Sequence, residues 1–192
     1  MQSSTKRIIV SGAAGRMGKQ IIVVVTADPG LSVVAGIDRK HAETLWDIPL
    51  LTSWENAPEA DLVVDFSSPD GLDAALDWCL STSTPLVSGT TGISSEQKER
   101  LVKAGESIPV LFAPNMSPGI NLLVQLAKIA AANLPDYDIE IVERHHNRKK
   151  DSPSGTALSI LEYVNSQRNV TQNKLTFGRG LGENIREQGE IG

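Results

Sequence analysis

The sequence has little of what marks secreted or membrane proteins. Cys79 is the only cysteine among 192 residues, so the chain cannot form an internal disulfide. It lies in "LDAALDWCL", among apolar helix formers, where a buried and unreactive thiol is expected rather than a nucleophile. No apolar run approaches the roughly 20 residues of a membrane-spanning helix, and the polar residues 1–7 do not resemble a signal peptide. These features predict a cytoplasmic protein that has no membrane partner.

A surplus of positive charge is also lacking. Lys and Arg total 18 against 23 Asp and Glu, for a net charge of −5. General nucleic-acid-binding proteins usually carry a basic surplus, so we do not expect nucleic acid as a partner. Against this background, "ERHHNRKKDSPSGTALSI" at 143–160 concentrates two adjacent histidines and four basic side chains. This local cluster predicts a local anion.

Short β-branched apolar runs alternate with helical patterns along the first part of the chain. This rhythm is typical of a mostly parallel sheet that helices cover on both faces. The expected strands lie at 7–12, 32–38, 61–67, 85–89 and 109–115. The expected helices lie at 16–27, at 70–80 with Pro69 opening the helix, and at 94–105 with Ser94 and Gln97 as a capping box. The pattern predicts an α/β domain of parallel strands over 1–117.

The pattern changes near Pro118. "INLLVQLAKIAAANL" is the longest amphipathic stretch, and its expected apolar face holds Ile120, Leu123, Val124, Ala127 and Ala131. The next run, "YDIEIVERHH", alternates and predicts an antiparallel or half-exposed sheet. One side of that run would carry Ile139, Ile141, Glu143 and His145. We therefore expect a second, α+β domain over 118–192.

The first functional motif is "VSGAAGRMG", in which Gly12, Gly15 and Gly18 follow the first strand. Such glycines allow a tight turn and let backbone amides approach a pyrophosphate at a helix N-terminus. Asp38 follows Gly18 after about 20 residues, where a carboxylate can hold the adenosine ribose. Arg39 could pair with a 2′-phosphate, so both NADPH and NADH fit. An ordinary strand-to-helix turn, followed by a solvated basic turn, is the alternative.

Two further loops follow expected strands, where ligands of open α/β sheets bind. They are "SGTTG" at 88–92 and "APNMSPG" at 113–119. The first offers backbone amides and hydroxyls to a flat ring. Because Gly, Pro, Asn and Ser dominate turns for conformational reasons, ordinary turn chemistry remains an alternative for both loops.

The basic segment leads into an expected helix start. Pro153 fits the first turn, and the amides after it would form an anion site at the helix N-terminus. His145 and Lys149 can exchange protons, because imidazole titrates near neutrality and crowding by cations lowers the pKa of a lysine. Together these groups predict a pocket for a small carboxylate-bearing molecule. A solvated charged face is the alternative.

These motifs resemble one family. "GAAGRMG", "DFS", "SGTTG", "APNMSPGIN" and above all "ERHHNRKKDSPSGTA" are similar to the 4-hydroxy-tetrahydrodipicolinate reductases, also called dihydrodipicolinate reductases, in the family's order and over the whole chain. The resemblance implies a Rossmann-type first domain and a substrate-binding second domain. It also implies NAD(P)H-dependent reduction of a small cyclic dicarboxylate, 4-hydroxy-tetrahydrodipicolinate, to tetrahydrodipicolinate with loss of water. The reaction belongs to lysine and diaminopimelate biosynthesis.

The resemblance also implies residue roles. His145 would give or take a proton, Lys149 would donate one, and the substrate would meet His146, Gly155 and Thr156. The implied cofactor-binding residues are Gly12, Ala13, Ala14, Gly15, Arg16, Met17, Asp38, Arg39, Gly89, Thr90, Thr91, Ala113, Pro114, Asn115 and Met116. No metal is expected, because adjacent histidines on a strand point to opposite sides.

Family members continue for several dozen residues beyond the point where this sequence stops. The second domain is therefore expected to be truncated, which puts the family's homotetramer in doubt here. Two other functions remain open. One is a nucleotide-binding homologue with impaired catalysis. The other is a different two-domain nicotinamide dehydrogenase, although the chain lacks the Glu-Lys-Pro string of the sugar enzymes.

Overall fold

The computed structural model describes residues 5–39, 44–145, 147, 152–168, 175–179, 181–185 and 190–192. The chain divides into two compact units, Met1–Pro114 and Asn115–Gly192. This division lies close to the domain boundary that the sequence predicts after residue 117. No described helix has both the length and the apolar character needed to cross a membrane.

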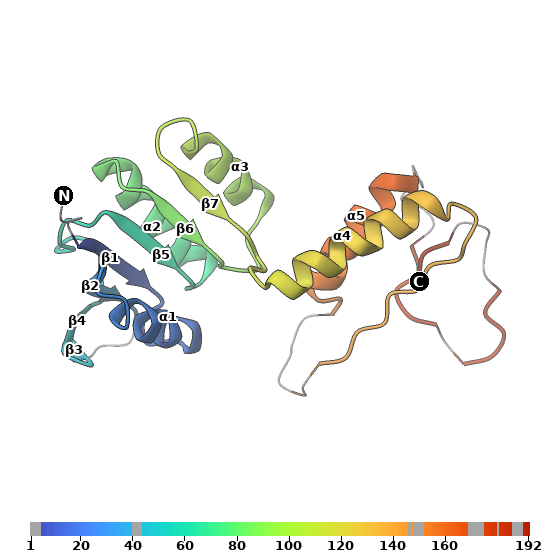
Figure 1. Cartoon of the computed structure of the whole chain (residues 1–192), viewed down its shortest axis with the longest axis horizontal. Coiled ribbons are helices and arrows are strands. Elements are labelled where there is room, and N and C mark those ends of the chain that lie inside the picture. Colours follow the sequence, from blue (N-terminus) through green and yellow to red (C-terminus); the bar gives the residue numbers. More distant parts are fainter. Residues whose placement is uncertain are drawn as a thin grey trace. The chain divides into compact units, whose positions relative to one another are not determined.

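The first unit is built on one sheet, ordered β3-β4-β2-β1-β5-β6-β7 (Figure 1). Neighbouring strands are parallel throughout, except that β3 and β4 are antiparallel. The strands are β1 Lys6–Ser11, β2 Leu31–Ile37, β3 Thr44–Leu45, β4 Ile48–Leu51, β5 Leu62–Asp65, β6 Leu86–Ser88 and β7 Val110–Phe112. The five predicted strands and the α/β class are confirmed. The strand order reverses at β1, and in such sheets ligands bind at the carboxyl edge beside this switch point.

Three helices cover this sheet, and local signals begin two of them. They are α1 Arg16–Thr26, α2 Pro69–Thr82 and α3 Ser95–Ala104. Pro69 is the first residue of α2, as predicted. The predicted capping box of α3 is also present, because Ser94 Oγ accepts from the Gln97 amide at 3.2 Å and Gln97 Oε1 accepts from the Ser94 amide at 2.9 Å.

The helices form a layer on each face of the sheet (Figure 1). Ile8 and Val10 of β1 pack in one core cluster with Ile22 of α1. Ile9, between them in sequence, points to the opposite face and packs with Leu76 of α2. Successive side chains of a strand alternate between faces, so burial on both sides requires the continuous apolar run of β1.

The β3–β4 hairpin is the part of this sheet that the sequence analysis missed. Trp46 and Asp47 make the turn with φ values of 52° and 63°, the left-handed conformation that two-residue hairpin turns require. Neither residue is a glycine, and Pro49 interrupts the apolar run of β4. The usual strand and turn signals are therefore weak here.

The second unit contains two packed helices, α4 Pro118–Asn133 and α5 Gly155–Arg168 (Figure 1). Val124 and Ala131 of α4 are buried, and Ala131 packs in one cluster with Val164 of α5. The prediction that Leu123 shares this buried face is wrong, since it is 49% exposed. One residue turns an α-helix by about 100°, so Leu123 points away from the side on which its buried neighbour Val124 lies.

The alternating run at 137–146 does not form an antiparallel ladder in its described part. Ile139 and Leu175 each make an isolated parallel bridge to Ile191. The Ile141 amide donates to the Gly192 carbonyl at 2.8 Å, and the Gly192 amide donates to the Ile139 carbonyl at 3.3 Å. Only residues 190–192 pair with this run in the described structure, which is too short a partner for a ladder.

Candidate functional site

The turn between β1 and α1 requires glycine at two positions. Gly12 has a φ of +76°, and a Cβ built there would lie 2.4 Å from the Phe66 carbonyl oxygen. A Cβ on Gly18 would lie 2.2 Å from the Gly12 carbonyl oxygen. The first glycine thus permits the left-handed turn, and the second lets α1 pack closely on it.

Asp38, at the end of β2, is attached to this turn. Its Oδ2 accepts from the Ala14 amide at 3.0 Å, and its own amide donates to the Leu51 carbonyl at 3.0 Å. Gly15 is the N-cap of α1 and makes no side-chain cap hydrogen bond. The positive end of α1 is therefore available for an anionic ligand beside a fixed carboxylate.

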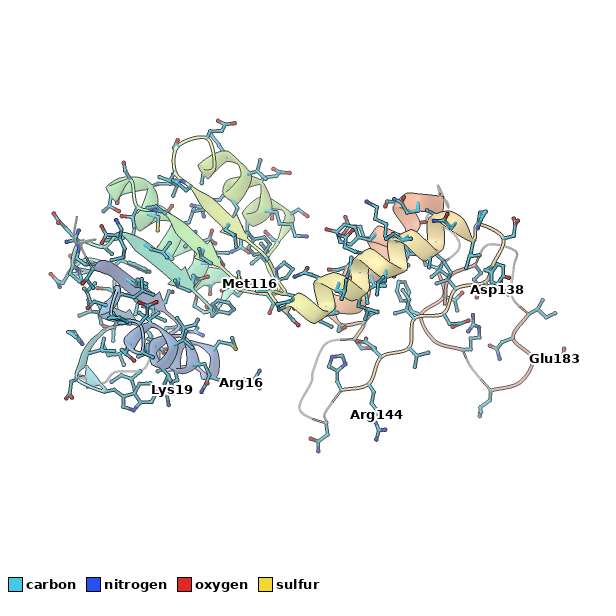
Figure 2. The ribbon with its side chains drawn as sticks, in the orientation of Figure 1. Arg16, Lys19, Met116, Asp138, Arg144 and Glu183 are labelled. Carbon is cyan, nitrogen blue, oxygen red and sulfur yellow. The ribbon has the colours of Figure 1, made fainter. Side chains whose placement is uncertain are left out.

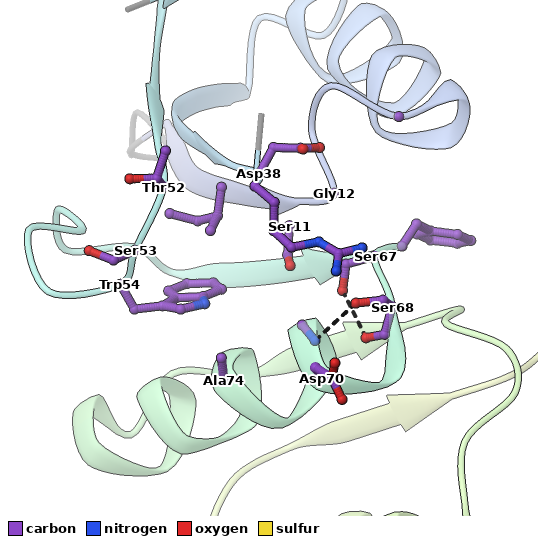
Figure 3. A pocket seen from close by; sticks show the side chains of 15 residues that line it. Ser11, Gly12, Asp38, Thr52, Ser53, Trp54, Ser67, Ser68, Asp70 and Ala74 are labelled. Carbon is purple, nitrogen blue, oxygen red and sulfur yellow. Dashed lines mark hydrogen bonds between the residues drawn. The ribbon is translucent and has the colours of Figure 1, made fainter. Parts of the chain in front are cut away.

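A pocket of about 510 Å³ lies beside this turn and Asp38 (Figure 3). This volume is within the range of small-molecule sites. The lining residues are Ser11, Gly12, Gly15, Ile37, Asp38, Arg39, Thr52, Ser53, Trp54, Phe66, Ser67, Ser68, Asp70, Gly71 and Ala74. Gly12, Gly15, Asp38 and Arg39 are the predicted cofactor residues among them.

Sequence reasoning assigned no role to the other parts of the lining. Thr52, Ser53 and Trp54 follow β4, and they were missed because β4 itself was missed. The Trp54 ring lies against the Trp78 ring, with centroids 5.2 Å apart. The loop from Phe66 to α2, which follows Asp65 of the "DFS" motif, forms another side of the pocket (Figure 3).

A buried carboxylate connects two loops at the carboxyl edge of the sheet. Asp65, at the end of β5, is 0% exposed. It accepts hydrogen bonds from Ser67 Oγ at 2.5 Å, Ser88 Oγ at 2.9 Å and Thr90 Oγ1 at 2.6 Å. The Ser67 amide donates to Thr90 Oγ1 at 2.9 Å. Thr90, a predicted cofactor residue, is 3% exposed, and the hydrogen bonds of its hydroxyl hold the two loops together.

Other predicted cofactor residues on the glycine turn differ in exposure. Ala13 is 0% exposed and packs in the core between the sheet and α1, so its side chain has a packing role. Arg16 and Met17 are exposed at the start of α1, and Arg16 is labelled there in Figure 2. None of the three lines the pocket.

The loops after β6 and β7 lie outside the pocket lining. Gly89 is buried under Phe66, and a Cβ on it would lie 2.2 Å from the phenyl ring. Thr91 is exposed. Ala113 is half-buried, and its amide donates to the Ser88 carbonyl at 3.0 Å.

The predicted loop residues 114–116 span the boundary between the units. Pro114 is exposed and ends the first unit, whereas Asn115 and the exposed Met116 belong to the second (Figure 2). Asn115 Oδ1 accepts from the Ser117 amide at 2.9 Å, and its Nδ2 donates to Thr156 Oγ1 at 3.1 Å. Asn115 thus connects the start of α4 with the start of α5.

The second unit brings His145 together with the start of α5. Glu143 Oε2 lies 3.3 Å from His145 Nδ1, and Glu143 Oε1 accepts from the Ser154 amide at 2.8 Å. Ser154 Oγ in turn accepts from the Ala157 amide at 3.0 Å. Gly155, the first residue of the helix, is exposed. The predicted residues His146 and Lys149 lie outside the described residues.

Two other sequence predictions concern metal and thiol chemistry. The described residues include no group of three or more His, Cys, Asp or Glu side chains suited to a metal ion. Cys79 is buried, as predicted. Burial, together with the charge of Asp65, raises the pKa of its thiol to about 12, so the thiolate does not form near neutral pH.

Comparisons with known proteins agree along the whole chain. Residues 6–116 match the family model of the dihydrodipicolinate reductase N-terminus, and residues 119–192 match that of the C-terminus. The 4-hydroxy-tetrahydrodipicolinate reductase of Clostridium novyi (strain NT) is 42% identical over 192 residues, which cover 97% of this chain and 73% of that relative. The reductase of Caldanaerobacter subterraneus subsp. tengcongensis is 38% identical over 187 residues, with the same coverage of 97% and 73%.

Among solved structures, the chain is similar to a dipicolinate-bound dihydrodipicolinate reductase from Paenisporosarcina sp. TG-14. The TM-score is 0.72 at 25% sequence identity, over 95% of this chain and 72% of that chain. Both domain models and these relatives lead to the same conclusion: the chain belongs to the dihydrodipicolinate reductase family.

Proposed function

We propose that this chain is an NAD(P)H-dependent 4-hydroxy-tetrahydrodipicolinate reductase. It reduces a small cyclic dicarboxylate to tetrahydrodipicolinate with loss of water, in lysine and diaminopimelate biosynthesis. The observation that carries the proposal is the pocket at the sheet's switch point, lined by Gly12, Asp38 and Arg39, in a chain of this family. A cytoplasmic location remains a prediction, as does the oligomeric state.

Three features of the first unit fit a nicotinamide dinucleotide. The backbone at Gly12 leaves no room for a Cβ, and the N-terminus of α1 has no side-chain cap. Asp38 lies beside both, because its carboxylate accepts from the Ala14 amide. The helix start would hold the pyrophosphate, Asp38 the ribose and Arg39 the 2′-phosphate of NADPH. The bound cofactor supplies the hydride.

The second unit would hold the substrate and manage its proton. The amides at the start of α5, with Gly155 and Thr156, suit a carboxylate because unpaired N–H groups and the helix dipole both favour an anion there. His145, beside this helix start, gives or takes the proton that accompanies reduction. Lys149 and His146 keep their predicted roles as proton donor and substrate contact.

The test is a spectrophotometric assay on the 192-residue chain, which follows oxidation of NADPH and of NADH with freshly generated substrate. Substrate-dependent oxidation that stops when substrate is omitted supports the reductase. Cofactor binding without turnover would instead favour the nucleotide-binding homologue with impaired catalysis. Turnover of a sugar or of homoserine, with none of the cyclic dicarboxylate, would favour a different nicotinamide dehydrogenase.

A further inference from the structure

Glu143 has no role in the function proposed above, yet it lies between two parts of the expected substrate site. Its carboxylate contacts His145 Nδ1 through Oε2 at 3.3 Å and the Ser154 amide through Oε1 at 2.8 Å. A negative charge beside the start of α5 opposes the binding of a dicarboxylate. These two contacts supply a reason for a carboxylate at this position.

The contact with His145 can select which ring nitrogen carries the proton of a neutral imidazole. An ionised carboxylate only accepts hydrogen bonds, so a hydrogen bond across this contact requires the proton on Nδ1. The lone pair is then on Nε2, which can accept a proton and return it. Without this contact the ring could adopt either tautomer and rotate about its side-chain bonds.

The contact with Ser154 ties the same carboxylate to the anion-binding end of α5. Ser154 is 4% exposed, its Oγ accepts from the Ala157 amide at 3.0 Å, and its carbonyl accepts from the Leu158 amide at 3.0 Å. Glu143 therefore bonds to the residue that caps the helix. The neighbouring side chain of Arg144 extends away from the two helices (Figure 2).

We propose that Glu143 is a positioning residue that fixes the tautomer of His145 and its place relative to the start of α5. The inference rests on the proposed function, because it concerns the proton transfer at His145. A residue that only stabilises the fold would make the same two contacts. Substitutions that separate the contacts distinguish the two roles.

Glu143→Gln keeps an oxygen for the Ser154 amide but presents an NH₂ group to His145 Nδ1. That nitrogen must then accept, so the ring proton moves to Nε2. We expect kcat to fall at least about tenfold, since a positioned acid or base contributes about 100-fold or more, while the KM for substrate stays within about threefold. Glu143→Ala removes both contacts and should lower kcat and raise KM together. Glu162→Gln, an exposed charge loss on α5, is the control and should change neither constant.

The tautomer is read directly from long-range ¹H–¹⁵N NMR spectra of the imidazoles, with His145→Asn to assign the signals. The expected spectrum has Nδ1 protonated in the unsubstituted chain and Nε2 protonated in Glu143→Gln. This readout does not depend on activity, so it tests the inference even if the chain has no reductase turnover. Wild-type kcat in Glu143→Gln, or the same tautomer in both proteins, would overturn the inference. A loss of thermal stability and of NADPH affinity that parallels the loss of kcat would show a structural role only.

Discussion

Replacing Gly12 by alanine tests the close approach on which the cofactor turn depends. At the native φ of +76°, a residue with a Cβ costs about 1–2 kcal/mol relative to glycine. The new Cβ would also lie 2.4 Å from the Phe66 carbonyl oxygen and 2.9 Å from the Ser67 Cα. Both neighbours are backbone atoms and cannot rotate away, so overpacking adds about 1–3 kcal/mol.

The free energy of unfolding should therefore fall by about 2–5 kcal/mol. At about 4 °C per kcal/mol for a domain of roughly 100 residues, the Tm should fall by roughly 8–20 °C. Gly92→Ala is the matched control, because Gly92 has the same φ of +76° with nothing within 4 Å of its Cβ. It should lose only the conformational part, about 1–2 kcal/mol. The difference between the two variants measures the contact with the loop after β5.

The assay is thermal unfolding of both variants followed by circular dichroism, with NADPH titrations at a temperature where both remain folded. We expect Gly12→Ala to bind NADPH at least about tenfold more weakly than Gly92→Ala, since relieving the clash moves pocket-lining backbone. Equal losses of stability in the two variants would refute the steric argument. Unchanged NADPH affinity in Gly12→Ala would refute the assignment of the pocket.

Three further predictions follow from single groups. Asp65→Ala leaves the buried hydroxyls of Ser88 and Thr90 without their acceptor. Urea unfolding should therefore show a free energy of unfolding lower by about 2–6 kcal/mol. A decrease below about 1 kcal/mol would contradict the hydrogen-bond network. Arg39→Ala should raise the Kd for NADPH about tenfold more than the Kd for NADH, because only NADPH has the 2′-phosphate; equal changes would exclude that contact. Burial raises the pKa of Cys79 from 9.0 to about 12, so the unfolded thiol ionises at a lower pH than the native one. The contribution of this thiol to the free energy of unfolding is fully present below pH 9 and is lost as pH rises toward 12. Rapid labelling of the native thiol by a disulfide reagent at pH 8 would contradict this burial.

Several features of the fold follow from short stretches of sequence. The apolar run of β1, the capping box at Ser94 and the proline that opens α2 each act within a few residues. Periodicity and caps depend on neighbours along the chain, so one sequence is enough to read them. The glycine at position 12 belongs with them, because its spacing from the first strand marks the turn.

The candidate site was only partly readable, because its contacts join distant residues. The carboxylate of Asp65 binds hydroxyls 23 and 25 residues away, and Asn115 reaches Thr156 over 41 residues. Trp54 lines the pocket because a hairpin with weak local signals carries the chain there. Such pairs leave no pattern in a single sequence.

The sequence by itself determined the alternation of strands and helices, the glycine turn and the family motifs. Only the tertiary structure decided that Leu123 is exposed, that residues 139–141 pair in parallel with 191–192, and that Glu143 lies between His145 and the start of α5. The physical reason is the distance along the chain over which each kind of interaction acts. Backbone preferences act between near neighbours, whereas side-chain contacts depend on which distant segments packing brings together.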